Sequence, residues 1–184
     1  MAELCRAAGT TSGPLTASDY WRQLTGRLEQ APDSADRDRL SALVSRLGNL
    51  AGIVPVTFGC WHGDLTRWNL ASTRAGLLVW DWERFTAGVP VGFDALHYWL
   101  QSEAGRAGAD PIQAAGDCVR RAPELLAPFG VSPRPARLTA LAYLAELSVR
   151  YLADRQAEAG ARLGAPGIWL TPALDSGLRT YRAD

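Results

Sequence analysis

The chain contains two early windows in which apolar residues recur at the three-to-four-residue spacing of one helix face. The first window holds Tyr20, Trp21, Leu24 and Leu28, and the second holds Leu40, Leu43, Val44 and Leu47. Ser18 precedes the first window as an N-cap, and Asp33 and Ser34 precede the second. Gly48 or Gly52 would end the second helix. The pattern therefore predicts two helices in the first third of the chain.

The hydrophobic period then changes from helical to alternating. Residues 54–58 alternate as a short strand. Residues 70–72 and 77–80 form two further apolar segments, and the turn-forming residues 73–76 separate them. We expect one strand followed by a small β-hairpin.

Helical patterns return in the second half of the chain, and Pro/Gly-rich segments separate the later ones. The expected helices cover residues 93–104, 111–127, 136–158 and 170–181, with breaks at 128–135 and 160–167. Residues 1–14 are small and polar, which predicts a flexible lead-in. The expected fold is α+β and mainly α-helical, with residues 15–184 as a single domain.

Composition fits a globular protein, with 184 residues, 47% hydrophobic and 21% charged. The formal net charge is +0, which gives no sign of a nucleic-acid or membrane partner. The N-terminus lacks the apolar core of a signal peptide, and Glu146 and Arg150 interrupt the longest apolar segment. The cysteines are odd in number and widely spaced, as in reduced thiols: Cys5, Cys60 and Cys118. We expect a cytoplasmic protein.

Residues 61–83, WHGDLTRWNLASTRAGLLVWDWE, carry the candidate chemistry. Phosphoryl transfer needs a group that positions the acceptor hydroxyl and oxygen ligands for magnesium. Asp64 lies in a loop directly after a strand, which suits the first role. Asn69 and Asp81 lie at opposite ends of the expected hairpin, so strand pairing would bring these two oxygen ligands together.

Other chemistries fit the same residues less well. His62 and Asp64 at an H-x-D spacing are compatible with a metallohydrolase, but the second histidine, His97, lies on an apolar helix. Two histidines that far apart supply too few nitrogen ligands for a zinc site. We interpret His97 as a packing residue.

The segment HGDLTRWN at residues 62–69, followed by VWDWE at 79–83, resembles the aminoglycoside phosphotransferase/choline kinase family, which has a protein-kinase-like fold. The resemblance implies that Asp64 is the catalytic base. It implies that Asn69 and Asp81 bind Mg²⁺ and, through it, ATP or another nucleoside triphosphate. His62 and Gly63 would shape the loop.

Further positions match that family less specifically. In PVGFDALHYWL, Asp94 would brace the catalytic loop by hydrogen bonding, with a helix N-cap as the alternative. Glu83 would assist the metal or bond to the backbone. Arg67 would contact the γ-phosphate, pair with an acid or remain solvated. Trp68 is the aromatic residue that we expect nearest to a ligand.

The resemblance covers only the C-terminal lobe of the family, and we expect the N-terminal β lobe to be absent. That lobe supplies a lysine that contacts ATP, whereas all 19 cationic side chains here are arginine. The resemblance implies an ATP-dependent transfer of the γ-phosphate to a hydroxyl of a small molecule, by a truncated or fragmentary family member. The alternative is a non-catalytic single-lobe module that binds a ligand or a protein.

The sequence leaves the partners and the phosphate acceptor open. Acids and arginines balance after Asp94, which disfavours a polycationic acceptor and leaves sugars and amino alcohols. The face toward the missing lobe should be apolar and exposed, with Trp21, Trp68 and Trp80 at its edge. We therefore expect self-association or a separate N-lobe polypeptide as partner.

Overall fold

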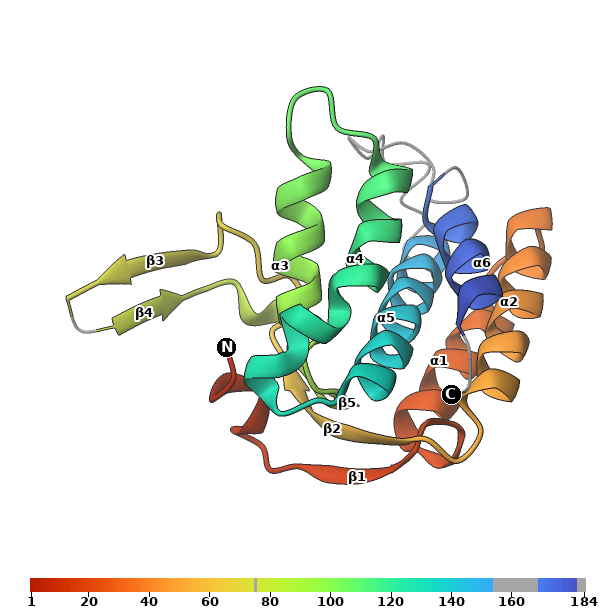
Figure 1. Cartoon of the computed structure of the whole chain (residues 1–184), viewed down its shortest axis with the longest axis horizontal. Coiled ribbons are helices and arrows are strands. Elements are labelled where there is room, and N and C mark those ends of the chain that lie inside the picture. Colours follow the sequence, from red (N-terminus) through yellow and green to blue (C-terminus); the bar gives the residue numbers. More distant parts are fainter. Residues whose placement is uncertain (75, 154–168, 182–184) are drawn as a thin grey trace.

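The computed structural model describes residues 1–74, 76–153 and 169–181, and this part of the chain is an α+β structure that is mainly helical. Its α-helices pack side by side over a small sheet, and a second, two-stranded sheet extends away from them (Figure 1). The helices are α1 (Asp19–Gln30), α2 (Ala35–Ala51), α3 (Phe93–Ala104), α4 (Pro111–Leu126), α5 (Pro133–Ala153) and α6 (Leu170–Thr180).

Serine caps begin the first two helices, as the sequence predicts. The Ser18 hydroxyl accepts a hydrogen bond from the Trp21 amide at 3.1 Å, and the Ser34 hydroxyl accepts one from the Arg37 amide at 3.1 Å. Gly52, with a φ of 51°, ends α2. The apolar stripes of both helices then pack against α5.

Helix α5 forms the centre of the structure. It contacts α1, α2, α3, α4 and α6, and nearly all of its residues from Leu138 to Val149 are buried. A helix that is buried on several sides lacks a single polar face, which fits the continuous apolar run in its sequence. The expected helix at 136–158 corresponds to α5, and its residues 154–158, with the break at 160–167, lie outside the described residues.

The larger sheet has the strand order β1-β2-β5 and is antiparallel. Its strands are β1 (Thr11–Pro14), β2 (Pro55–Trp61) and β5 (Thr86–Pro90). The expected hairpin is confirmed: β3 (Leu70–Thr73) pairs with β4 (Gly76–Val79), with Leu70 opposite Val79. Figure 1 shows this hairpin projecting away from the helices.

The structure differs from the expected flexible lead-in at residues 1–14. Strand β1 adds to the edge of β2, and the turn Leu4–Arg6 packs over the same strand. A side-chain carbon on Gly59 would lie 2.0 Å from the Cys5 carbonyl oxygen, so the turn and the strand touch at backbone distance. Backbone pairing needs no apolar side chains, which is why a polar sequence conceals this strand.

None of the described helices is long and apolar enough to cross a membrane. Glu146 is buried within α5 at 2% exposure, where it pairs with arginines. The charged residues that interrupt the apolar segment, Glu146 and Arg150, therefore pair with each other inside the protein.

Candidate functional site

The loop that follows β2 carries the expected site residues, and Asp94 holds its first turn. The Asp94 carboxylate accepts hydrogen bonds from the His62 amide at 2.8 Å and the Gly63 amide at 3.3 Å. Asp94 lies in the first turn of α3, whose N-cap is Gly92, so Asp94 is not the cap. Burial raises the pKa of Asp94, and the two amide hydrogen bonds oppose this rise. These two hydrogen bonds fix the backbone of the loop at His62 and Gly63.

Gly63 is required by the geometry of the loop. Its φ is 90°, and a side-chain carbon there would lie 2.3 Å from the Arg84 carbonyl oxygen. The Gly63 carbonyl accepts a hydrogen bond from the Arg150 guanidinium at 2.7 Å. The loop is therefore packed against the segment before β5 on one side and tied to α5 on another.

His62 joins the loop to the end of the hairpin. Its Nδ1 accepts a hydrogen bond from the Asp64 amide at 3.3 Å, and its Nε2 lies 2.8 Å from the Trp80 carbonyl oxygen. This arrangement assigns the proton to Nε2, because a carbonyl can only accept. The side chain is fully buried and packs on the Trp82 ring at 4.8 Å. His62 therefore has a structural role in shaping the loop.

Asp64 is held at both carboxylate oxygens and still reaches solvent. Oδ1 lies 3.2 Å from His97 Nε2, and Oδ2 accepts a hydrogen bond from the Asn69 amide at 3.2 Å. The side chain is 45% exposed. Burial raises the pKa of Asp64, but the hydrogen bond and charge of His97, with help from Arg84 and Asn69, lower it below its ordinary value. Asp64 is therefore a carboxylate near neutral pH.

Sequence reasoning missed the part that His97 plays. It is buried, as expected of a packing residue, but it lies between Asp64 and the Tyr143 hydroxyl, which is 2.9 Å from its Nδ1. Tyr143 is completely buried, and burial raises its pKa. The only sequence signal was a histidine three residues after Asp94, one helical turn along the same face.

A second set of supporting residues was also missed. The buried Glu146 carboxylate accepts two hydrogen bonds from Arg27, at 2.9 and 2.7 Å, and one from Arg150 at 3.0 Å. Arg150 also stacks over the Trp61 ring at 4.1 Å. An oppositely charged pair four residues apart inside an apolar helix was the available signal.

Asn69 and Asp81 lie at the two ends of the hairpin, just outside its paired strands. The Trp80 amide donates to the Asn69 carbonyl at 3.2 Å, which brings the following residue, Asp81, beside this end of β3. The Asn69 amide nitrogen bonds to Asp64, which leaves its side-chain oxygen as the available ligand atom. Asp81 has a φ of 67°, the only positive value at a non-glycine residue in the described chain.

Arg67, Glu83 and Trp68 are exposed at the surface near this arrangement. Arg67 is exposed and stacks over the Trp68 ring at 4.8 Å, and Glu83 is exposed within the turn Trp82–Arg84. The described residues contain no cluster of three or more His, Cys, Asp and Glu side chains that could hold a metal. The site therefore offers two oxygen-bearing side chains, from Asn69 and Asp81, rather than a complete metal cage.

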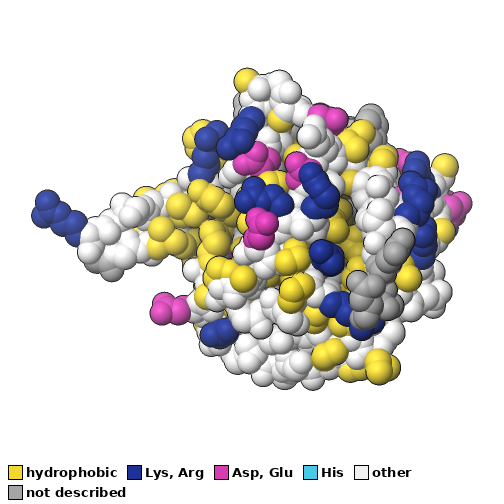
Figure 2. Space-filling view, viewed as in Figure 1, with side chains coloured by type: hydrophobic (Ala, Val, Ile, Leu, Met, Phe, Trp, Pro, Cys, Tyr) yellow, Lys and Arg dark blue, Asp and Glu magenta, His cyan; other side chains and the backbone are white. Residues whose placement is uncertain are grey.

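Large apolar side chains are exposed around the hairpin and its base, and we call this set the hairpin patch. Figure 2 shows hydrophobic surface where the hairpin meets the body. The patch consists of Trp68, Leu77, Leu78, Trp80, Trp82 and Phe85, each 41–72% exposed. Trp21, expected at this edge, instead packs on the core beside Gly48.

Comparison with solved structures gives matches, among them a kinase of low similarity. No protein-family model and no curated protein matches the chain. The solved structure of a glucosamine kinase in complex with glucosamine, ADP and inorganic phosphate is similar over 98% of this chain and 45% of that chain. The sequence identity is 18% and the TM-score is 0.35. The chain thus spans less than half the length of that kinase.

Proposed function

We propose that the chain is the C-terminal lobe of an aminoglycoside phosphotransferase/choline kinase-like protein that moves the γ-phosphate of ATP to a hydroxyl of a small molecule. One observation carries this proposal. The Asp64 carboxylate, the Asn69 amide and the Asp81 segment meet at the base of the hairpin, and Asp94 holds the Asp64 loop through two backbone amides. Positioning of this kind is most of what phosphoryl transfer asks of a protein.

Asp64 is the residue that receives the acceptor hydroxyl. Each carboxylate oxygen has one bond from the protein, from His97 or Asn69, and retains a lone pair for the hydroxyl proton. Because the pKa of Asp64 is lowered, the group is ionised and weakly basic. It therefore orients the hydroxyl first and accepts the proton once the oxygen bonds to phosphorus.

Asn69 and Asp81 would hold Mg²⁺. Both present hard oxygen atoms, and magnesium is usually held by one or two protein side chains together with substrate phosphates and water. When bound, Mg²⁺ neutralises charge on the phosphates. The αL backbone at Asp81 supports a functional role, since such a conformation costs free energy and is found at ligand sites.

The test uses the full chain with ATP and Mg²⁺. Isothermal titration should show Mg²⁺-dependent ATP binding that weakens about tenfold or more in Asp81→Asn, because one charged ligand is lost. Asp175→Asn, on α6 and paired with Arg46 and Arg179, is the matched control and should bind as wild type. Equal affinity in wild type and Asp81→Asn contradicts the assignment of Asp81.

Transfer is measured separately, by ³¹P NMR with a panel of sugars and amino alcohols. A phosphorylated product that disappears in Asp64→Asn, while ATP affinity is retained, supports the catalytic assignment. The alternative, a non-catalytic module that binds a ligand or a protein, predicts nucleotide or partner binding without transfer. The hairpin patch favours this alternative where a second copy of the chain covers it.

A further inference from the structure

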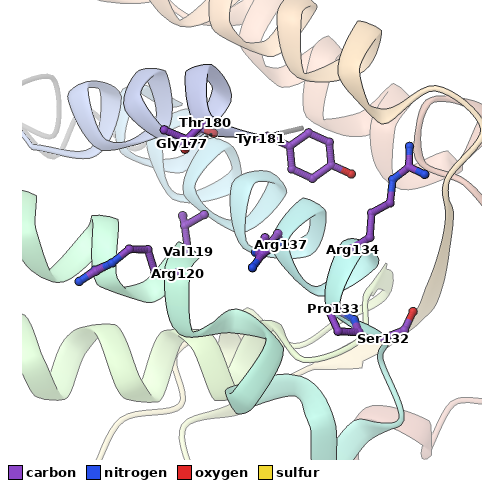
Figure 3. A pocket seen from close by; sticks show the side chains of 9 residues that line it. All are labelled: Val119, Arg120, Ser132, Pro133, Arg134, Arg137, Gly177, Thr180 and Tyr181. Atoms are coloured by element: carbon purple, nitrogen blue, oxygen red, sulfur yellow. Dashed lines mark hydrogen bonds between the residues drawn. The ribbon is translucent and has the colours of Figure 1, made fainter. Parts of the chain in front are cut away.

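A second cavity lies between α4, α5 and α6, away from the Asp64 loop. Its volume is about 670 Å³, within the range of small-molecule sites. Figure 3 shows side chains from all three helices around it. The polar lining residues are Arg120, Ser132, Arg134, Arg137, Thr180 and Tyr181. The Asp64 loop contacts the other half of α5, through Arg150, thirteen residues after Arg137 and about 20 Å along the helix.

The described residues that line this cavity carry positive charge only. Three arginines line it, and none of the described lining residues is acidic. Arg120 pairs with Asp117, which lies outside the lining. Arg137 is exposed near the start of α5. Guanidinium groups gathered at one concave surface favour a planar anion such as a carboxylate or a phosphate.

The start of α5 adds to this positive potential. Ser132 and Pro133 line the cavity at the first turn of this 21-residue helix. The N-terminus of a helix carries unpaired amides and the positive end of the helix dipole. Figure 3 shows this turn on the same side of the cavity as Arg134.

Tyr181 provides an independent indication of a ligand. Its side chain lines the cavity and is only 8% exposed, yet its buried hydroxyl has no hydrogen-bond partner among the described residues. In Figure 3 its ring extends from the end of α6 toward the side of the cavity where Arg134 lies. A buried unpaired hydroxyl costs free energy unless something supplies its partner. An anion beside the arginines would accept this hydrogen bond.

We propose that this cavity binds a small molecule that carries a phosphate or carboxylate group. Arg137 supplies the charge, and the Tyr181 hydroxyl donates a hydrogen bond to the anion. The site is independent of the phosphotransferase proposed above, because none of the described residues that line it belongs to the Asp64 loop or the hairpin.

Binding is tested by titrating inorganic phosphate, and separately citrate, into the full chain at constant ionic strength, with chloride as the reference anion. Backbone NMR shifts at Gly177 and Thr180 should move and saturate. Arg137→Gln should weaken binding about tenfold through loss of one charge-assisted bond. Arg106→Gln removes an equal charge from an exposed position on the α3–α4 connection and should have no effect. Comparing the affinities for phosphate and for citrate shows whether the site prefers a phosphate or a carboxylate group.

Tyr181→Phe gives a second test that does not depend on a change in net charge. It removes the unpaired hydroxyl, so the free protein should keep or raise its melting temperature, while anion affinity should fall about fivefold. Asp64→Asn should leave anion affinity unchanged, which separates this site from the proposed active site. The proposal is overturned if neither anion gives saturable shifts, or if Arg137→Gln and Tyr181→Phe both bind as wild type.

Discussion

The imidazole of His97 lies 3.2 Å from the Asp64 carboxylate, so a residue on α3 holds the carboxylate at the centre of the candidate site. On its other side the same imidazole contacts the buried Tyr143 hydroxyl at 2.9 Å. The orientation of Asp64 thus depends on the core of the helical body as well as on its own loop. The pKa of Asp64 therefore reports whether the contact between His97 and Asp64 is intact.

Replacing His97 with leucine should raise the pKa of Asp64. Burial already raises this pKa, and the hydrogen bond and charge of His97 are the main influences that lower it. Titration of the Asp64 side-chain ¹³C shift measures the change directly, with Asp64→Asn to assign the signal. His97→Gln keeps an N–H donor and should show a smaller rise. An unchanged titration in His97→Leu would contradict this account.

The same substitution should change how stability depends on pH. Asp64 has a lowered pKa in the folded protein, so its contribution is present above the unfolded value of about 3.9 and is lost as pH falls through the folded value. The stability difference between wild type and His97→Leu should therefore be largest above about pH 4 and shrink in acid. Urea unfolding at several pH values tests this. If the stability difference between wild type and His97→Leu does not change with pH, His97 stabilises the protein by packing alone and not through Asp64.

Gly63→Ala should destabilise the protein more than Gly108→Ala. Both glycines have positive φ, 90° and 77°, but only Gly63 has a close neighbour, with Arg84 oxygen 2.3 Å from the added carbon. Gly108→Ala reports the backbone cost alone, about 1–2 kcal/mol. The additional loss at Gly63, seen in thermal or urea unfolding, measures the contact between the loop and the segment before β5. Equal losses would show that this contact relaxes at no cost.

Glu146→Ala should be strongly destabilising, by about 3–5 kcal/mol, because it leaves the mostly buried Arg150 without its carboxylate. Arg27, the other partner of Glu146, is partly exposed, so water can solvate its guanidinium once the carboxylate is removed. We therefore expect a destabilisation near the lower end of this range. Glu124→Ala is the control. That glutamate pairs with Arg121 at the surface, and its removal should change stability by about 0.5 kcal/mol or less. Similar effects in the two variants would contradict the role assigned to Glu146.

The hairpin patch should cause association in solution. Six exposed apolar side chains lie on one projecting element and its base, whereas isolated exposed apolar residues are ordinary. Leu78→Glu should shift sedimentation toward the monomer at concentrations where wild type associates. Ile53→Glu changes an isolated side chain that is 91% exposed and should leave association unchanged. A monomeric wild type over the whole concentration range would contradict the prediction.

The helices and the hairpin were predictable because their signals are local. Ser18 and Ser34 cap helices whose apolar stripes are complete within a few turns, and the 73–76 turn separates two short apolar strands. Strand β1 was not predictable, since its pairing partner lies more than forty residues away and its own side chains are polar. Backbone pairing with a distant strand does not produce an alternating hydrophobic pattern in such a segment.

The candidate site divides in the same way. Asp64, Asn69 and Asp81 could be selected from the spacing of one segment, since the hairpin between them is a local structure. His97, Tyr143 and Arg150 could not, because their contacts to the loop depend on how α3 and α5 pack. The sequence pattern of a buried helix face does not show which residue of another element its histidine or arginine contacts.

The hairpin leaves the body directly after Asn69 and returns directly before Asp81, with Trp80 bonded to Asn69 where the two strands meet. The hydrogen bond from the Trp80 amide to the Asn69 carbonyl links the two ends of the hairpin. Because the Asn69 amide also bonds to Asp64, a displacement of the hairpin would be transmitted through Asn69 to the Asp64 loop. A molecule bound to the exposed strands would therefore act on Asn69 and, through it, on Asp64 without touching either residue.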